Sequence, residues 1–145
     1  MEVRLWLRLL TCANLIEAGI RRRLRAQFGI TLPRFDLMAQ LDRMAEGISL
    51  GELSRRMMVT NGNVTTIVDA LVAQGLVART PAPADRRTVL VRLTPEGRRH
   101  FRAMAMAYEG WIVDIFADLN PFEIDRLMAL LGKAKESAAQ ALDDP

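Results

Sequence analysis

The sequence of 145 residues contains one cysteine, Cys12, one histidine, His100, and one tyrosine, Tyr108. A single thiol cannot close an internal disulfide, and so few metal-binding side chains predict no metal site. The sequence has neither a glycine-rich phosphate loop nor a nucleophile elbow, so we expect neither an enzyme nor a cofactor. No apolar run approaches the ~18–20 residues that span a membrane, and charges interrupt the N-terminus, unlike a signal peptide. We therefore expect a cytoplasmic protein without a membrane partner.

Lysine is also scarce, because only Lys133 and Lys135 among the 20 basic residues are not arginine. The formal net charge is +3 over residues 1–48, +5 over residues 49–102 and −5 over residues 103–145. If the chain has a nucleic-acid-binding surface, that surface is therefore expected in the middle of the chain. Arginine presents a planar fork that matches phosphate or guanine, although a high-GC coding bias explains the preference equally well.

Most of the chain has the periodicity of amphipathic helices. Apolar residues recur every three or four positions over residues 3–28, and Gly29 provides a stop. Thr31 begins a second helix that runs through Met44. Further helices are expected over residues 50–57, with Glu52 placed for a capping box, over residues 61–74, from Pro95 to about Leu119, and from Pro121.

The one clear β signal is a hairpin with strands at residues 76–78 and 88–93. Its loop carries two prolines and Asp85, Arg86 and Arg87, so the tip should stand away from the body. Two short helices joined by a tight turn and followed by a hairpin form a winged helix-turn-helix. The predicted fold is mainly α with a small β-hairpin wing.

The first and last helices have apolar faces that a compact winged unit cannot cover. We predict a single domain in which residues 31–97 form the DNA-binding unit. Residues 1–30 and 98–145 would then pack against a second copy of the chain as a homodimer. The alternative is a monomer that folds its termini back on itself.

The helix after the tight turn is the expected reader of DNA. Asn61, Asn63, Thr65 and Thr66 lie off its apolar stripe, in its first two turns. Amide and hydroxyl groups can bind base edges or phosphates, and a threonine methyl can contact the thymine methyl. An ordinary capped, solvated helix would explain Thr60 and Asn61 alone.

At the wing tip, an arginine could enter a narrow minor groove, and Asp85 could hold one guanidinium group in an extended fork. The alternative is a solvated Asp-Arg pair that contributes almost nothing to stability.

Residues 53–79, and Asp85-Arg86-Arg87 followed by Leu-Thr-Pro-Glu-Gly at 93–97, resemble the multiple-antibiotic-resistance regulator (MarR) family. The resemblance covers essentially the whole chain. It implies a homodimer that binds double-stranded DNA at a palindromic operator and usually represses nearby genes. Phenolic or other amphipathic small molecules, or oxidants, commonly relieve that repression in the family. The DNA-contacting residues implied here are Arg55, Arg56, Thr60, Asn61, Asn63, Thr65, Thr66, Asp85, Arg86 and Arg87. Arg55 and Arg56 could equally pair with Glu52 or Asp69.

The resemblance also implies an effector cleft between the dimer helices and the reader unit. The residues that could line it are Trp6, Arg34, Asp36, Met38, Met57 and Met58. Cys12 invites comparison with a peroxide-sensing branch of the family, but we expect it to be a small buried hydrophobe because the tyrosines of that branch are missing. Two alternatives to a ligand-responsive repressor stay open. One is a redox-responsive regulator that uses Cys12, and the other is a winged-helix protein-interaction module without DNA binding.

Overall fold

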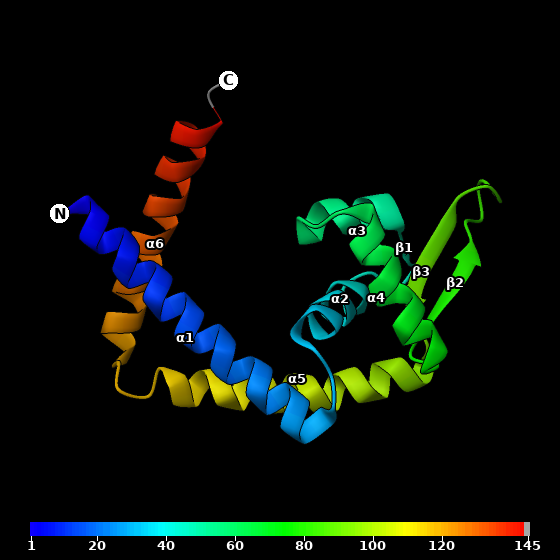
Figure 1. Cartoon of the computed structure of the whole chain (residues 1–145), viewed down its shortest axis with the longest axis horizontal. Coiled ribbons are helices and arrows are strands. Elements are labelled where there is room, and N and C mark those ends of the chain that lie inside the picture. The colour runs from blue at the N-terminus through cyan, green and yellow to red at the C-terminus, as the bar shows by residue number, and fades with distance from the viewer. Residues whose placement is uncertain (144–145) are drawn as a thin grey trace. The chain divides into compact units, whose positions relative to one another are not determined.

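The computed structural model describes residues 1–143 of the chain. Within these residues the elements follow one another as shown in Figure 1. They are α1 (Glu2–Phe28), α2 (Leu32–Asp42), β1 (Ile48–Ser49), α3 (Leu50–Met57), α4 (Asn61–Ala73), β2 (Val77–Pro81), β3 (Val89–Leu93), α5 (Pro95–Ile115) and α6 (Pro121–Leu142). The prediction of a mainly helical chain with a small β wing is confirmed.

The chain divides into two compact units. Residues 1–109 contain α1 to α4, the sheet and most of α5, whereas the described residues from Gly110 onward contain the end of α5 and α6. In the first unit, the β2–β3 hairpin extends beyond α4, and its loop lies at the far end (Figure 1). None of the helices in residues 1–143 combines the length and the apolar character needed to cross a bilayer.

Side chains at the helix starts determine where the helices begin. The oxygens of Thr31, Ser49, Thr60 and Asn120 each accept the backbone N–H three residues later. Such caps satisfy N–H groups that have no partner inside the helix. The predicted starts of α2, α3 and α4 are confirmed. Both α2 and α5 end before the predicted Met44 and Leu119, because tighter turns with i−3 hydrogen bonds replace their last turn.

The sheet contains a strand that the sequence did not predict. β1 pairs antiparallel with β3, which also pairs with β2, so the order is β1-β3-β2. β2 is longer than expected and includes Pro81, which lacks a backbone N–H and is tolerated because β2 is an edge strand. β1 is only two residues long, so no periodicity marked it.

The core of the first unit lies between α2, α3, α4 and the sheet. Its fully buried side chains come from all of these elements and from the end of α1: Leu24, Leu37, Met38, Leu41, Leu53, Val64, Val68, Leu71 and Val91. Phe35 of α2 packs against Phe101 and Tyr108 of α5, with ring centroids 5.6 and 5.0 Å apart. The late part of α1 and the early part of α5 are thereby attached to the winged unit.

Candidate nucleic-acid interface

The first two turns of α4 present a polar face. Asn61, Asn63 and Thr66 are exposed, whereas Val64 and Val68 on the opposite side are fully buried. The hydroxyl of Thr60 caps the helix by accepting the N–H of Asn63 at 3.3 Å. Amide side chains on an exposed helix face can reach the base edges of a major groove. The positive end of the helix dipole favours a phosphate at the same place.

Thr65 and Thr66 use their hydroxyl protons within the helix. Thr65 Oγ1 donates to the carbonyl of Asn61 at 2.9 Å, and Thr66 Oγ1 donates to the carbonyl of Gly62 at 3.0 Å. In this conformation each threonine offers a partner only its oxygen lone pairs and its methyl group. These suit the amino group of adenine or cytosine and the methyl of thymine.

The turn between α3 and α4 sets the angle of the reader helix. Met58 adopts the left-handed conformation with φ of 55°, which is costly for a residue with a side chain. Ser54 Oγ donates to the carbonyl of Val59 at 2.5 Å, which ties the turn to α3. Met58 is 91% exposed beside the start of α4.

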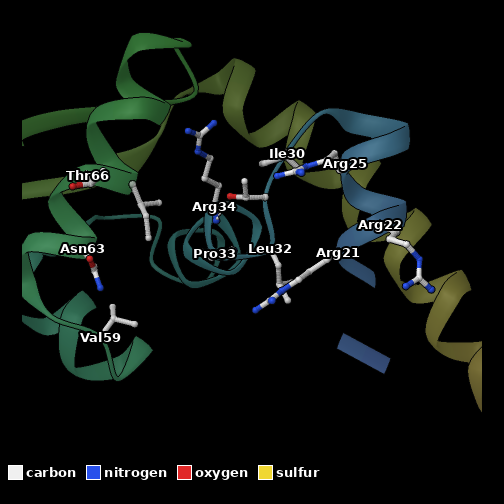
Figure 2. Close-up of a pocket in the computed structure, with 12 residues that line it drawn as sticks. Arg21, Arg22, Arg25, Ile30, Leu32, Pro33, Arg34, Val59, Asn63 and Thr66 are labelled. Carbon is white, nitrogen blue, oxygen red and sulfur yellow. Dashed lines mark hydrogen bonds between the residues drawn. The ribbon is translucent and has the colours of Figure 1, made fainter. Parts of the chain in front are cut away.

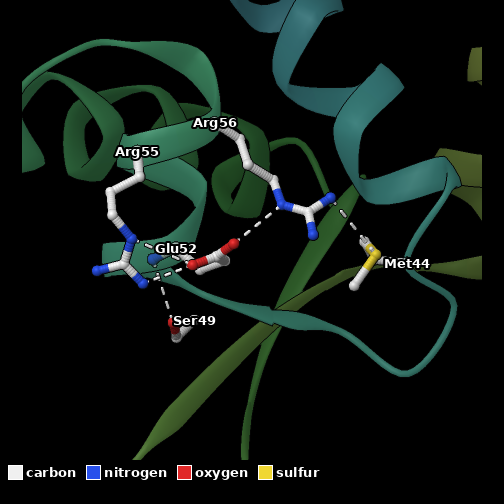
Figure 3. Close-up of polar contacts among 5 residues, drawn as sticks. All are labelled: Met44, Ser49, Glu52, Arg55 and Arg56. Carbon is white, nitrogen blue, oxygen red and sulfur yellow. Dashed lines mark hydrogen bonds and ion pairs between the residues drawn. The ribbon is translucent and has the colours of Figure 1, made fainter. Parts of the chain in front are cut away.

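Two arginines of α3 share one carboxylate (Figure 3). Glu52 Oε2 accepts from Arg55 at Nε and Nη2, and Glu52 Oε1 accepts from Arg56 Nε at 3.2 Å. Hydrogen bonds from Arg55 and then Arg56 hold the pKa of Glu52 below its ordinary value. Of the two partners that the sequence left open, the arginines take Glu52 and not Asp69. The predicted capping box is wrong, because these arginines draw the Glu52 carboxylate away from the N-cap.

Two hydrogen bonds from backbone N–H groups to Asp85 shape the wing tip. Asp85 Oδ1 accepts the backbone N–H of Arg87 at 3.0 Å, and the N–H of Thr88 donates to the Asp85 carbonyl at 3.0 Å. Asp85 therefore shapes the loop, and the prediction that it would hold a guanidinium group is wrong. Arg86 and Arg87 are both exposed.

An ion pair joins the reader helix to the wing. Arg79 of β2 donates through Nη2 to the Asp69 carboxylate of α4. The pair links the helix and the strand directly, in addition to the core contacts beneath them. Sequence reasoning considered Asp69 only as a possible partner of the α3 arginines.

A basic groove lies between the end of α1, the start of α2 and α4 (Figure 2). It has a volume of about 680 Å³. We call it the arginine groove, and its lining is Arg21, Arg22, Arg25, Ile30, Thr31, Leu32, Pro33, Arg34, Val59, Asn63, Thr66 and Ile67. Arg21 forms an ion pair of 2.5 Å with Glu17, which leaves excess positive charge over an apolar floor. Asn63 and Thr66 belong both to this groove and to the polar face of α4.

Of the six residues predicted to line an effector cleft, Arg34 alone lines the arginine groove. Met38 is fully buried in the core, whereas Trp6 is 58% exposed on α1. Met57 is half-buried at the end of α3, and Met58 lies in the exposed turn. The structure therefore does not bring the six side chains together, because helical periodicity turns Met38 inward.

Asp36 lies at the edge of the contact between α1, α2 and α5. Partial burial, reinforced by the charge of Glu17, raises the pKa of Asp36, and Arg21 opposes the shift. The pKa of Tyr108 is also raised, by burial and by the charge of Asp36. Among residues 1–143, no ion pair joins Asp36 to Arg34 or Arg43.

Cys12 is exposed on α1, so the prediction that it is buried is wrong for the single chain. The buried residues of α1 are Ile20 and Leu24, both in the other half of the helix. His100 is exposed. In the described part of the chain, no three His, Cys, Asp or Glu side chains gather closely enough to hold a metal ion.

Comparison with known proteins supplies the family. The model of the MarR family matches residues 28–88, which cover α2, β1, α3, α4, β2 and the wing loop. The chain is 33% identical over 120 residues to the transcriptional activatory protein BadR of Rhodopseudomonas palustris, covering 79% of this chain and 68% of that protein. It is 30% identical to a MarR family transcriptional regulator from Silicibacter pomeroyi, whose crystal structure matches with a TM-score of 0.80 over 94% of both chains. The chain belongs to the MarR family.

A further solved structure is a mutant MarR from E. coli complexed with operator DNA. It is 26% identical, with a TM-score of 0.79, over 91% of this chain and 94% of that one. Membership in the MarR family confirms the prediction of a winged-helix transcriptional regulator, and it places the chain among DNA-binding regulators rather than enzymes.

Sequence reasoning left the partner of Arg55 and Arg56 open between Glu52 and Asp69. It missed two features of this MarR-family interface, which are the Asp69–Arg79 pair and the arginines of α1. The i+3 and i+4 spacing of Arg55 and Arg56 from Glu52 was a usable signal, because such residues are neighbours on a helix. The pairing across α4 and β2 had no signal in the sequence.

Proposed function

We propose that this MarR-family protein is a homodimer that binds double-stranded operator DNA through α4 and the β2–β3 wing and represses transcription. The observation that carries the proposal is the exposed polar face of α4, at Asn61, Asn63 and Thr66, in one compact unit with a wing that carries Arg86 and Arg87. The first group suits base edges in a major groove, and the second suits phosphates or a narrow minor groove.

Each candidate residue has a role in this proposal. Asn61, Asn63, Thr65 and Thr66 would contact base edges, and Thr60 would contact a phosphate at the helix start. Arg86 and Arg87 would contact the minor groove and the backbone beside it, while Asp85 shapes their loop. Arg55 and Arg56 would contact phosphates from α3. The E. coli MarR structure with operator DNA supports this division, since its chain has the same fold.

The proposed dimer rests on apolar side chains that each unit leaves uncovered. Val3, Leu5 and Trp6 are exposed on α1, and Phe122, Met128 and Leu130 are exposed on α6. Residues 1–30 and 98–145 would form the dimer interface, and residues 31–97 would bind DNA. Two copies related by a twofold axis require a palindromic operator with half-sites roughly one helical turn apart.

A titration of the DNA immediately upstream of the gene tests DNA binding. Replacing Asn61 and Asn63 together with Ala, or Arg86 and Arg87 together with Ala, should weaken operator binding by about 1–3 kcal/mol for each side chain that reads a groove. Replacement of Arg43, an exposed arginine at the end of α2 that is not among the proposed contacts, is the control. No complex with the wild-type protein at low salt would instead support a protein-interaction module.

Repression is tested with a reporter gene under the same upstream DNA. Expression should rise when the regulator is deleted, because a dimer on the promoter hinders the polymerase. BadR is named an activatory protein. A fall in reporter expression after deletion would assign activation to this chain as well.

The arginine groove is the site proposed for a small-molecule effector. Its guanidinium groups and apolar floor favour an aromatic carboxylate, and Asn63 and Thr66 would transmit occupancy to the DNA-binding face. Benzoate should release the operator complex, and benzamide, which lacks the charge, should not. Arg25→Gln should weaken the response to benzoate, and equal release by both compounds would contradict the proposal.

The alternative of a redox-responsive regulator is tested with an oxidant. If Cys12 senses oxidants, hydrogen peroxide should release wild-type protein from DNA reversibly and leave Cys12→Ser bound. Equal behaviour of the two proteins removes this alternative.

A further inference from the structure

Glu52 is the shared partner of two arginines that would face DNA. It occupies the third position of α3, and its backbone N–H donates to the Ser49 cap at 3.2 Å. Its Oε2 accepts from Arg55 Nε at 3.2 Å and from Arg55 Nη2 at 2.5 Å, and its Oε1 accepts from Arg56 Nε at 3.2 Å. Arg56 Nη1 also lies 3.8 Å from Met44 Sδ (Figure 3). One carboxylate thus accepts hydrogen bonds from both guanidinium groups.

A second glutamate at the same helix position behaves differently. Glu123 occupies the third position of α6, and its carboxylate accepts the N–H of the N-cap Asn120 at 2.9 Å, which completes a capping box. In α3 the equivalent carboxylate is held by Arg55 and Arg56. In α3 the glutamate carboxylate therefore does not accept the N–H of the N-cap residue, and it forms a cluster with two arginines.

This cluster contributes little to holding the fold. The side chains of Glu52, Arg56 and Arg55 are 38%, 40% and 74% exposed. Exposed ion pairs are strongly screened by water and salt, so their effect on stability is small. Their effect on an approaching polyanion is larger, because the cluster presents a net charge of +1 where two unpaired arginines would present +2.

We propose that Glu52 is a specificity-determining residue of the DNA interface, which withholds Arg55 and Arg56 from the phosphates of non-operator DNA. The inference rests on the proposed DNA binding. Non-specific binding depends almost entirely on phosphate contacts, whereas base contacts supply the discrimination. A carboxylate that competes with phosphate for both guanidinium groups therefore weakens binding to all DNA. On operator DNA, base contacts by α4 offset that loss.

The geometry leaves both arginines able to act on the operator. Arg55 keeps Nη1 free of the carboxylate, and Arg56 keeps Nη2 free of both Glu52 and Met44. These nitrogens can donate to a phosphate only in the orientation that Glu52 imposes. A protein can become specific by weakening its binding to every wrong partner while it keeps favourable contacts with the right one.

The test compares Glu52→Gln with the wild type on two duplexes, the operator and a shuffled sequence of equal composition, between about 50 and 200 mM salt. Glu52→Gln should bind the shuffled duplex roughly two- to fivefold more tightly, with a salt slope steeper by about 1 for each arginine released. Operator affinity should change less, so the ratio of the two affinities should fall. Adding Arg55→Gln and Arg56→Gln should remove the gain.

Glu46→Gln is the matched control, since Glu46 is an exposed acid of the same unit whose side chain binds no arginine within the described residues. It changes the net charge by the same amount and should leave the ratio near the wild-type value. Equal affinity and salt slope for Glu52→Gln and the wild type on the shuffled duplex would overturn the inference, as would an equal effect of Glu46→Gln. Failure of the proposed function is recognised separately, by a wild type that does not distinguish the operator from the shuffled duplex.

Discussion

Gly97 lies where the first turn of α5 presses on the base of the wing. The N–H of Thr94 donates to the Leu76 carbonyl at 3.1 Å, and Thr94 Oγ1 donates to the Gly75 carbonyl at 2.7 Å. A methyl group at Gly97 would come within 1.9 Å of the same Leu76 carbonyl oxygen. Only glycine allows the helix to approach the backbone this closely.

Gly97→Ala should therefore destabilise the protein by about 1–3 kcal/mol, as overpacking of a well-packed contact does. The measurement is the free energy of unfolding in urea. Gly51→Ala is the matched control, because nothing lies within 4 Å of a methyl group at Gly51 of α3. There, better helix propensity should leave stability unchanged or slightly raised. A loss of stability at Gly51 equal to that at Gly97 would contradict the steric explanation.

The shifted pKa of Asp36 makes the free energy of unfolding depend on pH. The unfolded chain ionises this carboxyl near its ordinary pKa of 3.8, whereas burial and then Glu17 raise its pKa in the folded chain. Between the two values the folded chain holds a proton that the unfolded chain has released. This contribution therefore favours folding at low pH and is lost as the pH rises through that window.

Asp36→Asn should accordingly raise the free energy of unfolding at pH 7 and flatten its pH dependence just above pH 3.8. Denaturant titrations at a series of pH values measure both effects. Asp42→Asn, at the exposed end of the same helix, supplies the comparison. An Asp36→Asn protein that is less stable than the wild type at pH 7 would show that the carboxylate is favourably bound.

At the scale of elements, the wing and the reader helix are coupled by Arg79 and Asp69. The two residues lie on β2 and α4, and both also remain partly exposed. Because the pair sits between the two elements proposed to contact DNA, it should set the angle of the wing more than the stability of the fold.

Arg79→Gln should weaken operator binding several-fold. It should also reduce the further loss of affinity caused by Arg86→Ala, because a wing that the ion pair no longer holds contributes less to operator binding. A double-mutant cycle on operator affinity measures this coupling. Asp69→Asn should show the same coupling to Arg86→Ala. Strict additivity of the two effects would show that the pair acts independently of the wing.

The helices, their starts and the end of α1 were predictable because their signals are local. Thr31, Ser49 and Thr60 cap helices three residues before the N–H groups they accept, and Gly29 ends α1 in a left-handed conformation. Strand β1 was not predictable, since its two residues become a strand only through pairing with β3. The partner of Arg79 was not predictable either, and the sequence left both Glu52 and Asp69 open as partners of Arg55 and Arg56. Long side chains reach several acids, and only the packed backbone selects one.

At the scale of the whole molecule, the described residues from Gly110 onward form a unit with an apolar groove. The groove has a volume of about 490 Å³, and its lining is Ile112, Val113, Phe116, Ala117, Leu119, Ile124, Leu127, Met128 and Leu131. Every described residue of α6 is exposed. A single chain that leaves such a surface in water is expected to bury it in a partner, and the proposed twofold operator makes a second copy the natural partner.

Leu127→Asp should therefore convert the proposed dimer to a monomer, because a carboxylate would be buried without a partner in the interface. Sedimentation velocity measures the change in mass. Operator affinity should fall with it, since a monomer contacts only one half-site. Gln140→Asp adds the same charge to an exposed polar position of α6, outside the groove, and should leave the dimer intact. A Leu127→Asp protein that still sediments as a dimer would place the interface on other residues, with the exposed first half of α1 as the next surface to alter.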